Sequence, residues 1–388
     1  MVTDACSRIL DDYIPKYDSD IVRILQNNFL LLGNTNMDEF AMGSSTYSEK
    51  FGQTLNPINK NYAIGGSSGG SAAALFHSGL FSLGSDTGGS VRLPASLTNT
   101  LGFKPTRGVI SRFGLISFSN SIETIGIFTK NEIKTIVQIL NLIELNNEWK
   151  DDTVIKLKRE NRNLDKVKFK ILIPTSIFLK KYCDHDVYQD FVFFLNDITA
   201  KYDNIKIFES IELDKIMIYL LDFYFQFSSL EAYSNLLRYD NTIFPCFNLQ
   251  KKTLKFSDFD QYRSKVRDTN LGKNVINRLN IAKKIIKEQK VNDIVKQYWN
   301  IKKQISLLDF DFIFTPGSIK KFFIDRTTYE ADILYPLANI GNLPAMVFHN
   351  KVKDKTIPLQ IIGKHGQDWT IIKWIEKYVN LKKNNDEK

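Results

Sequence analysis

Two glycine- and serine-rich strings carry the residue types that could do chemistry in this chain. The first, Gly-Gly-Ser-Ser-Gly-Gly-Ser, occupies residues 65–71, and the second, Gly-Ser-Asp-Thr-Gly-Gly-Ser, occupies residues 84–90. Glycine lets the backbone approach closely and point several N–H groups at one place. A serine hydroxyl among such N–H groups has the surroundings of a nucleophile beside an oxyanion hole. The two strings therefore predict nucleophilic catalysis by serine.

Other interpretations of the strings fit less well. A phosphate-binding P-loop requires Lys-Ser or Lys-Thr after its glycines, and no lysine follows Gly70. A nucleophile elbow of the form Gly-x-Ser-x-Gly fits residues 65–69, but it also needs an acid and a histidine later in the chain. His349 or His365 could serve, although neither lies in a recognisable motif. Two turns with solvated serines are a further alternative, which the length and specificity of both strings disfavour.

The composition is that of a globular protein with a basic surface. The chain has 388 residues, a net charge of +9 and no apolar run of about 18 residues, so no membrane span is expected. The lysines are scattered, which favours a solvated surface over a site for RNA or another polyanion. No basic cluster is interleaved with aromatic residues. We therefore expect any contact with nucleic acid to be indirect, through a partner.

Metal and disulfide chemistry are not indicated. The three cysteines have no CxxC spacing and the four histidines are dispersed, so no metal site is predicted and a reducing compartment fits. The first residues have neither a basic start nor an apolar core and do not form a signal or transit peptide.

Predicted helices and strands alternate along the chain, which indicates an α/β fold with helices on both faces of a sheet. Residues 29–33, apolar on both faces and ended by glycine, predict a buried strand. We expect one domain over residues 1–381, a charged surface insertion at 146–166 and a disordered tail at 382–388. The helices are predicted at 20–28, 70–78, 90–97, 130–145, 186–202, 211–238, 274–290, 294–308 and 368–379. The other strands are predicted at 80–83, 101–106, 169–174, 205–208, 310–316, 344–348 and 358–362.

The strings and their neighbours resemble the signature of the amidase signature family. Gly-Phe-Lys-Pro-Thr-Arg-Gly at 102–108 continues the resemblance. Residues 34–45 are similar to the A subunits of glutamyl-tRNA(Gln) amidotransferases. The same similarity is found in the C-terminal half, at residues 231–240, 332–344 and 360–364. The resemblance covers nearly the whole chain. It implies the amidase-signature fold, a central mixed twisted sheet covered by helices on both faces, with its N-terminal part missing here.

The family's Ser–cis-Ser–Lys triad implies roles for both strings. Ser90 resembles the nucleophile that forms the acyl ester, and Ser67 resembles the cis-peptide serine that relays the proton. The backbone N–H groups of Thr87, Gly88 and Gly89, together with that of Ser90, would form the oxyanion hole.

Charged residues have implied roles in binding and scaffolding. Arg278 and Asp332 match the positions that hold the α-carboxylate and α-amino group of a glutamine substrate. An ordinary surface charge is the alternative for each. Asp86 and Arg92 resemble charges that hold the loop of the second string, with a packing role favoured over a chemical one.

The family's lysine base is expected to be absent from the chain. In the family it lies in a Val-Lys-Asp-Asn type of motif upstream of the first string, and residues 3–10 already match the segment beyond that motif. Without a base the serine hydroxyl is not activated. Lys104, in the Gly-Phe-Lys-Pro-Thr turn, is expected to be structural.

The resemblance implies a glutaminase-type subunit that releases ammonia from glutamine for Gln-tRNA(Gln) synthesis. It implies no cofactor in this subunit, a partner subunit that binds tRNA and uses ATP and Mg²⁺, and a small accessory subunit. The lysine- and asparagine-rich composition suggests the mitochondrial matrix, with bacterial cytoplasm or plastid as alternatives. A catalytically inactive structural subunit and a stand-alone amidase for another amide remain open.

Overall fold

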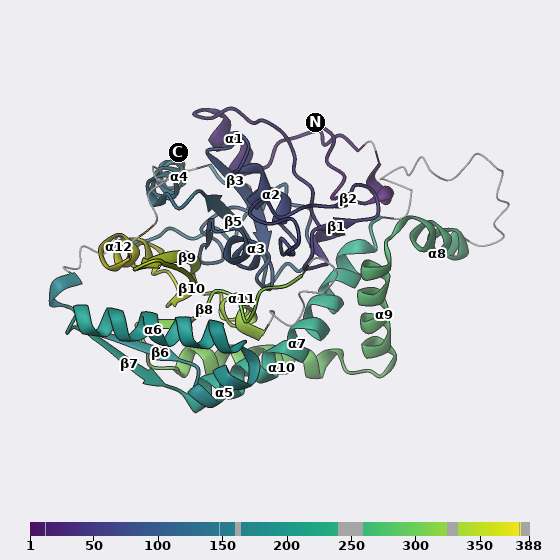
Figure 1. Cartoon of the computed structure of the whole chain (residues 1–388). Coiled ribbons are helices and arrows are strands. Elements are labelled where there is room, and N and C mark those ends of the chain that lie inside the picture. The colour runs from purple at the N-terminus through teal and green to yellow at the C-terminus, as the bar shows by residue number, and fades with distance from the viewer. Residues whose placement is uncertain are drawn as a thin grey trace.

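A mixed sheet forms the centre of the molecule (Figure 1). The computed structural model describes residues 1–11, 13–146, 148–159, 164–239, 259–323, 333–379 and 381. Within these residues the main sheet has eight strands in the order β3-β5-β4-β9-β10-β8-β6-β7. In that order their bounds are Phe81–Asp86, Thr124–Thr129, Leu101–Lys104, Ala345–Val352, Lys355–Gly363, Phe312–Pro316, Phe169–Ile173 and Ile205–Glu209. A separate hairpin pairs β1 (Tyr47–Ser48) with β2 (Gly52–Gln53).

The sheet changes from antiparallel to parallel at β8. All pairs from β3 to β8 are antiparallel, whereas β6 is parallel to both β8 and β7. Parallel neighbours need a crossover connection. Two helices, α5 (Ser176–Tyr182) and α6 (His185–Lys201), supply it between β6 and β7. The mixed α/β sheet expected from the sequence is therefore confirmed.

Helices flank this sheet and extend beyond it (Figure 1). α3 contacts β4, β9 and β10, α6 contacts β7, β8 and β10, and α7 packs against α9, α10 and α11. The remaining bounds are α1 Asp20–Gln26, α2 Gly69–Ala74, α3 Arg92–Leu97, α4 Ile133–Leu145, α7 Ile211–Leu236, α8 Phe259–Asn270, α9 Lys273–Lys287, α10 Val291–Leu307, α11 Pro336–Ile340 and α12 Asp368–Tyr378. Short 3-10 helices lie at Arg8–Leu10, Glu39–Ala41 and Leu164–Lys166.

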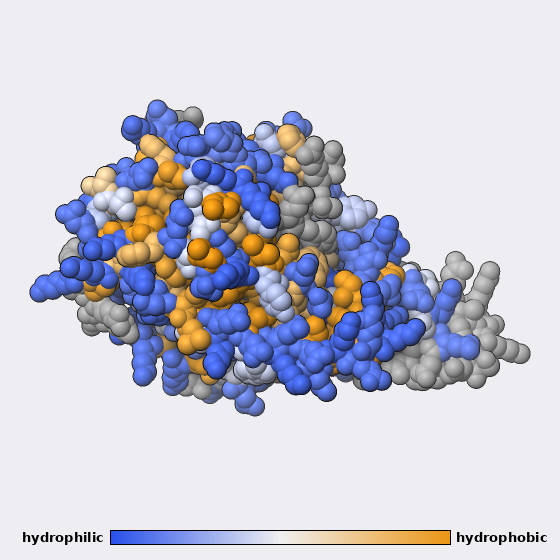
Figure 2. Space-filling view, turned by 90° about the horizontal axis from the view of Figure 1, so that it is seen from below, coloured by the Kyte–Doolittle hydropathy of each residue, from blue (hydrophilic) through white to orange (hydrophobic). Residues whose placement is uncertain are grey.

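Two apolar cores hold these layers together. The larger one lies between the sheet and its helices, where Phe103, Ile127 and Phe312 are fully buried. A smaller one joins Ile9 and Phe40 to the helices α7, α8 and α9. Seen from below, the surface is mainly hydrophilic with several apolar patches (Figure 2). In the described residues no helix combines the length and apolar character needed to cross a bilayer.

Several predicted elements differ from the structure. Strand β5 was not predicted, because Gly126 interrupts its apolar pattern; that glycine is needed, since a Cβ there would lie 2.8 Å from the Phe103 carbonyl oxygen. Residues 29–33 form no strand, which is a wrong prediction, since no neighbouring strand pairs with them in the described structure. Within the expected insertion, Ile155 N–H donates to the Gly108 carbonyl at 2.9 Å. The expected tail, 382–388, lies outside the described residues.

Candidate active site

The two glycine-serine strings meet at the start of α2. The Ser68 N–H donates to the carbonyl oxygen of Ser90 at 3.2 Å. Ser67 is fully buried and Ser90 is 7% exposed. The Gly66–Ser67 peptide bond is cis. Within the described chain neither the Ser67 nor the Ser90 hydroxyl has a hydrogen-bond partner, and the Ser67 Oγ atom is itself buried. A buried hydroxyl without a partner is costly, so it marks a position where a further group is expected to bind.

The segment at 34–46 forms the wall that holds Ser67. The Asp38 N–H donates to the Ser67 carbonyl at 3.2 Å, and the Asp38 carboxylate accepts the N–H of Thr46 at 2.8 Å. Thr46 Oγ1 in turn donates to Gly65 O at 2.7 Å and accepts from Gly69 N–H at 2.9 Å. Only glycine fits at position 69, since a Cβ would lie 2.4 Å from Thr46 Oγ1. Backbone groups on both sides of Ser67 are therefore fixed by one polar network.

A buried ion pair fixes the second string. Arg92 Nη2 and Nε donate to the two oxygens of Asp86 at 2.9 and 3.0 Å. The other Arg92 contacts reach Asn339 Oδ1 and Gln360 Oε1, each at 2.6 Å, and the Tyr335 carbonyl at 3.1 Å. Burial alone would raise the pKa of Asp86, but the Arg92 guanidinium lowers it to about 2. The scaffold role expected for Asp86 and Arg92 is confirmed.

The same carboxylate decides which N–H groups remain free. Asp86 Oδ1 accepts the Gly89 N–H at 3.0 Å, so this N–H is not available to an oxyanion. The structure thus contradicts the expected role of Gly89, because an acceptor within the second string already occupies its donor. The N–H groups of Thr87, Gly88 and Ser90 donate to no acceptor in the described residues. These three donors form the candidate oxyanion hole.

Two tyrosines pack directly against this backbone turn. A Cβ at position 88 would lie 2.4 Å from Cζ of Tyr224, and one at position 89 would lie 2.5 Å from Cγ of Tyr335. Gly89 also has φ +119°, which disfavours any other residue. The tyrosines therefore exclude water from one side of the turn. A water-poor environment strengthens the interaction of the N–H dipoles with developing charge.

Arg278 lies in an aromatic cage beside Tyr224. Its guanidinium is 4.3 Å from the Phe225 ring centroid, 5.3 Å from that of Phe118 and 5.5 Å from that of Tyr224. It is 5% exposed and donates from Nη1 to Ser228 Oγ at 2.8 Å. The alternative of an ordinary surface charge is therefore wrong for Arg278. Asp332, the other residue expected to bind substrate, lies outside the described residues.

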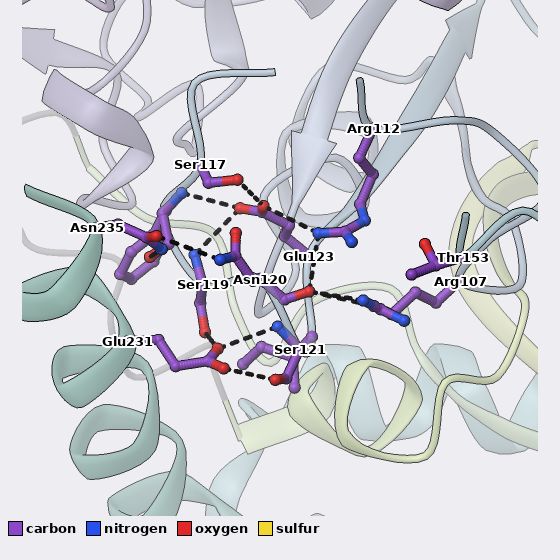
Figure 3. Close-up of polar contacts among 12 residues, drawn as sticks. Arg107, Arg112, Ser117, Ser119, Asn120, Ser121, Glu123, Thr153, Glu231 and Asn235 are labelled. Carbon is purple, nitrogen blue, oxygen red and sulfur yellow. Dashed lines mark hydrogen bonds and ion pairs between the residues drawn. The ribbon is translucent and has the colours of Figure 1, made fainter. Parts of the chain in front are cut away.

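A polar network links the loop at 117–123 to α7 (Figure 3). Glu123 accepts the Phe118 N–H at 2.9 Å. Glu231, on α7, accepts the Ser121 N–H at 3.1 Å and the Ser121 and Ser119 hydroxyls. Since α7 also carries Tyr224, this network joins the loop at 117–123 to the helix that supplies most of the cage.

Lys104 is buried away from the two serine hydroxyls. Its Nζ donates to the Pro105 carbonyl at 3.0 Å, and none of its contacts in the described chain involves Ser67 or Ser90. Burial, with the nearby Arg92 charge, lowers its pKa to about 7. These contacts agree with a structural role. Nor do the described residues contain a group of three or more His, Cys, Asp or Glu side chains that could hold a metal.

Comparison with known proteins identifies the family. The family model described as Amidase matches residues 1–372. The chain belongs to the amidase family. This amidase-family chain is similar to the A subunit of the glutamyl-tRNA(Gln) amidotransferase of Borreliella burgdorferi, with 34% identity over 96% of this chain and 79% of the relative. The protein of the same name from Sulfolobus acidocaldarius is 33% identical over 98% and 83%.

Solved structures agree with the amidase fold. The crystal structure of the glutamyl-tRNA(Gln) amidotransferase A subunit from Thermotoga maritima matches with a TM-score of 0.75 and 27% identity, over 99% of this chain and 81% of that one. Kluyveromyces lactis allophanate hydrolase matches with a TM-score of 0.75 at 19% identity, over 98% of this chain and 60% of that one, which supports the fold alone. The fold and the family expected from the sequence are thus confirmed.

Several residues of this amidase-family site were not predicted. Tyr224, Tyr335 and Asn339 lie far from both strings in sequence, and no motif marks them. Two adjacent glycines at 88–89 indicate a close approach, but not which side chain approaches. Asp38 lies in the segment at 34–45 that carries the family resemblance, and that position was the only signal available for it.

The buried Lys104 makes a testable contribution to the pH dependence of stability. Its pKa is about 7 in the fold and about 10.5 when exposed, so between these values the unfolded chain binds the extra proton. Stability is therefore expected to rise with pH in this window, by at most about 1.4 kcal/mol per pH unit from this group. We expect Lys104→Met to remove this rise, measured by urea unfolding from about pH 7.5 to 8.5.

Three other groups with large pKa shifts titrate outside the measured range of about pH 7.5 to 8.5. Burial raises the pKa of Asp38 to about 6 and of Glu39 to about 7, and that of Cys6 from 9.0 to about 11. Each of these opposes the effect of Lys104, below about pH 7 for the acids and above about pH 9 for the thiol. Lys215→Met, at an exposed lysine, is the control. An unchanged slope in Lys104→Met would show that Lys104 does not titrate there.

Proposed function

We propose that this chain is the glutamine-hydrolysing A subunit of a glutamyl-tRNA(Gln) amidotransferase. The observation that carries the proposal is the buried, partnerless Ser67 hydroxyl next to the backbone of Ser90 and three free N–H donors. The relatives bearing that subunit name match nearly the whole chain, which supports this substrate over other amides. The proposed reaction converts glutamine and water to glutamate and ammonia.

The arrangement suits acyl transfer through Ser90. Its Oγ attacks the side-chain amide carbon of glutamine and gives its proton to Ser67, which passes a proton to the departing ammonia. The N–H groups of Thr87, Gly88 and Ser90 stabilise the oxyanion that forms. Water then cleaves the acyl ester and releases glutamate. The base that activates Ser67 would be a lysine amine, as the family resemblance implies.

Arg278 is proposed to bind the substrate carboxylate. Its single described hydrogen bond, to Ser228, leaves guanidinium donors for a carboxylate, and the aromatic rings keep it in a fixed orientation. Asp332 is proposed to bind the α-amino group. Together these contacts would select a free amino acid amide over a simple amide.

The proposed context is that of an assembly. Ammonia would pass to a partner subunit that binds tRNA and uses ATP and Mg²⁺, with a small accessory subunit, while this subunit holds no cofactor. The mitochondrial matrix is the proposed location, with bacterial cytoplasm or plastid as alternatives. A structural, inactive subunit is the second candidate, because no lysine contacts Ser67 in the described chain. Copurification with a tRNA-binding partner, together with ammonia release from glutamine, separates these candidates from a stand-alone amidase.

Arg278→Met tests the substrate assignment in the assembled amidotransferase. We expect KM for glutamine to rise at least about tenfold, with a smaller effect on kcat, since a charge-assisted hydrogen bond worth about 1.5–3 kcal/mol is lost. Steady-state ammonia release measures both constants. Arg23→Met, at a half-exposed arginine on α1, is the matched control. An unaltered KM in Arg278→Met would remove Arg278 from the substrate site.

A further inference from the structure

Glu39 joins the segment at 34–46 to the start of α9. One of its carboxylate oxygens accepts the Gly272 N–H at 2.7 Å, and the other accepts the Ser7 hydroxyl. A side chain at position 272 would displace this carboxylate, because a Cβ there would clash with Glu39 Oε2. Glu39 and Gly272 are 233 positions apart in the sequence. The fold, and not a local motif, therefore makes this contact.

The start of α9 needs an acceptor from another part of the chain. A helix begins with N–H groups that have no partner within the helix, and a side-chain oxygen of the N-cap residue commonly accepts one of them. The N-cap residue of α9 is Gly272, which has no side chain, and the first turn carries no acidic residue. Glu39 therefore supplies an acceptor that the local sequence of α9 lacks.

The residue before Glu39 is attached to the first glycine-serine string. The Asp38 N–H donates to the carbonyl oxygen of Ser67 at 3.2 Å. The two residues after Glu39, Phe40 and Ala41, have φ angles of +49° and +60°, in the left-handed region that such side chains disfavour. A strained turn of this kind persists only where the surrounding contacts enforce it. One short turn thus holds Ser67 on one side and α9 on the other.

α9 carries Arg278, the proposed ligand of the substrate carboxylate. Arg278 follows Gly272 by six positions, which is less than two helical turns. The smaller apolar core contains Phe40, Val275 on α9 and Phe118 of the aromatic cage. A displacement of the start of α9 would therefore move Arg278 relative to the two serines.

We propose that Glu39 is a positioning residue that fixes the separation between Arg278 and the two candidate catalytic serines. Arg278 would hold the α-carboxylate while Ser90 attacks the side-chain amide, so this separation decides which amino acid amide fits. Glutamine carries its amide one methylene further from the α-carbon than asparagine does. A fixed separation therefore favours one of the two. The inference rests on the proposed function and adds to it the contact that selects substrate length.

Glu39→Ala tests this role in the assembled amidotransferase, by steady-state ammonia release. The assay is run at about pH 8.5, above the Glu39 pKa of about 7, so that one ionisation state is compared. We expect KM for glutamine to rise at least about fivefold, and the ratio of kcat/KM for glutamine to that for asparagine to fall at least about threefold, because small misplacements of substrate are costly. Partial unfolding would instead lower kcat and leave KM unchanged.

Two further variants separate the hydrogen bond from its surroundings. Glu39→Gln keeps an acceptor for the Gly272 N–H and should restore most of the affinity for glutamine. Glu49→Gln is the matched control, because Glu49 also lies beside Gly272 but no hydrogen bond joins the two in the described residues. Its KM for glutamine should stay within about twofold of the unmutated value.

A double-mutant cycle with Arg278→Met tests whether Glu39 acts through Arg278. Where Arg278 is already replaced, Glu39→Ala should change KM by less than about twofold. Fully additive increases in KM would overturn the proposal. An unchanged KM in Glu39→Ala, a fall in kcat alone, or an equal effect in Glu49→Gln would do the same, and each of these results leaves the proposed function intact. An unaltered KM in Arg278→Met would instead contradict the proposed substrate site, and with it a role of Glu39 that runs through Arg278.

Discussion

Asp86→Asn is expected to lower the free energy of unfolding by about 3–5 kcal/mol. The change keeps the shape of the side chain but leaves the fully buried Arg92 without a counter-charge. In the unmutated protein, Arg92 and Asn339 donate to a carboxylate oxygen of Asp86. In the variant an amide N–H₂ can take the place of that oxygen, so donors would face a donor. Equilibrium unfolding in urea measures the loss, with Glu212→Gln as the control. Glu212 pairs with Lys215 on the surface, where an ion pair contributes at most about 1 kcal/mol.

The acid side of the stability curve offers a second check of the same pair. The pKa of Asp86 is about 2 in the fold, against an ordinary 3.8, so its contribution is present above about pH 4 and is lost as pH falls towards 2. Asp86→Asn should flatten the curve in that range. A loss of less than about 1 kcal/mol near pH 7 would mean that Asn339 and Gln360 hold Arg92 without the carboxylate.

Ser90→Ala is expected to abolish ammonia release from glutamine, by at least about 10³-fold in kcat, in the assembled amidotransferase. The variant removes the atom that would form the acyl ester and changes nothing in the Asp86–Arg92 scaffold. Ser67→Ala is expected to lose activity to a similar degree, since the Ser67 hydroxyl is the proposed path for the proton. The double variant should be little worse than either single one, because residues that act as a unit are not additive.

The controls separate chemistry from folding. Ser78→Ala changes an exposed serine just after α2 and should keep full activity. Unfolding midpoints should agree among the active-site variants and this control. Full turnover in Ser90→Ala would exclude the acyl-ester mechanism, whereas turnover retained only in Ser67→Ala would move the proton path to another group.

The sequence predicts the candidate catalytic serines well because each lies in a short, contiguous string of residues. Glycines adjacent to Ser67 and Ser90 determine that the backbone can turn tightly and expose N–H groups, whatever the rest of the chain does. Alternation of apolar segments likewise predicts a helix-covered sheet. The same local logic fails at 29–33, where an apolar run indicates a strand but cannot indicate whether a neighbouring strand is present.

What the sequence alone determined, then, is the pair of serines, their glycine-rich turns and the family to which they belong. Tertiary structure decided which donors are free and which charges are buried. The Gly89 N–H donates to Asp86 and is therefore not free. Arg278, which the sequence left open as a surface charge, lies in an aromatic cage. The reason is distance along the chain, since Tyr335 and Asn339 contact residues 86–92 across some two hundred and fifty positions. Only the fold brings such residues to the two strings, where their packing determines what the serines can do.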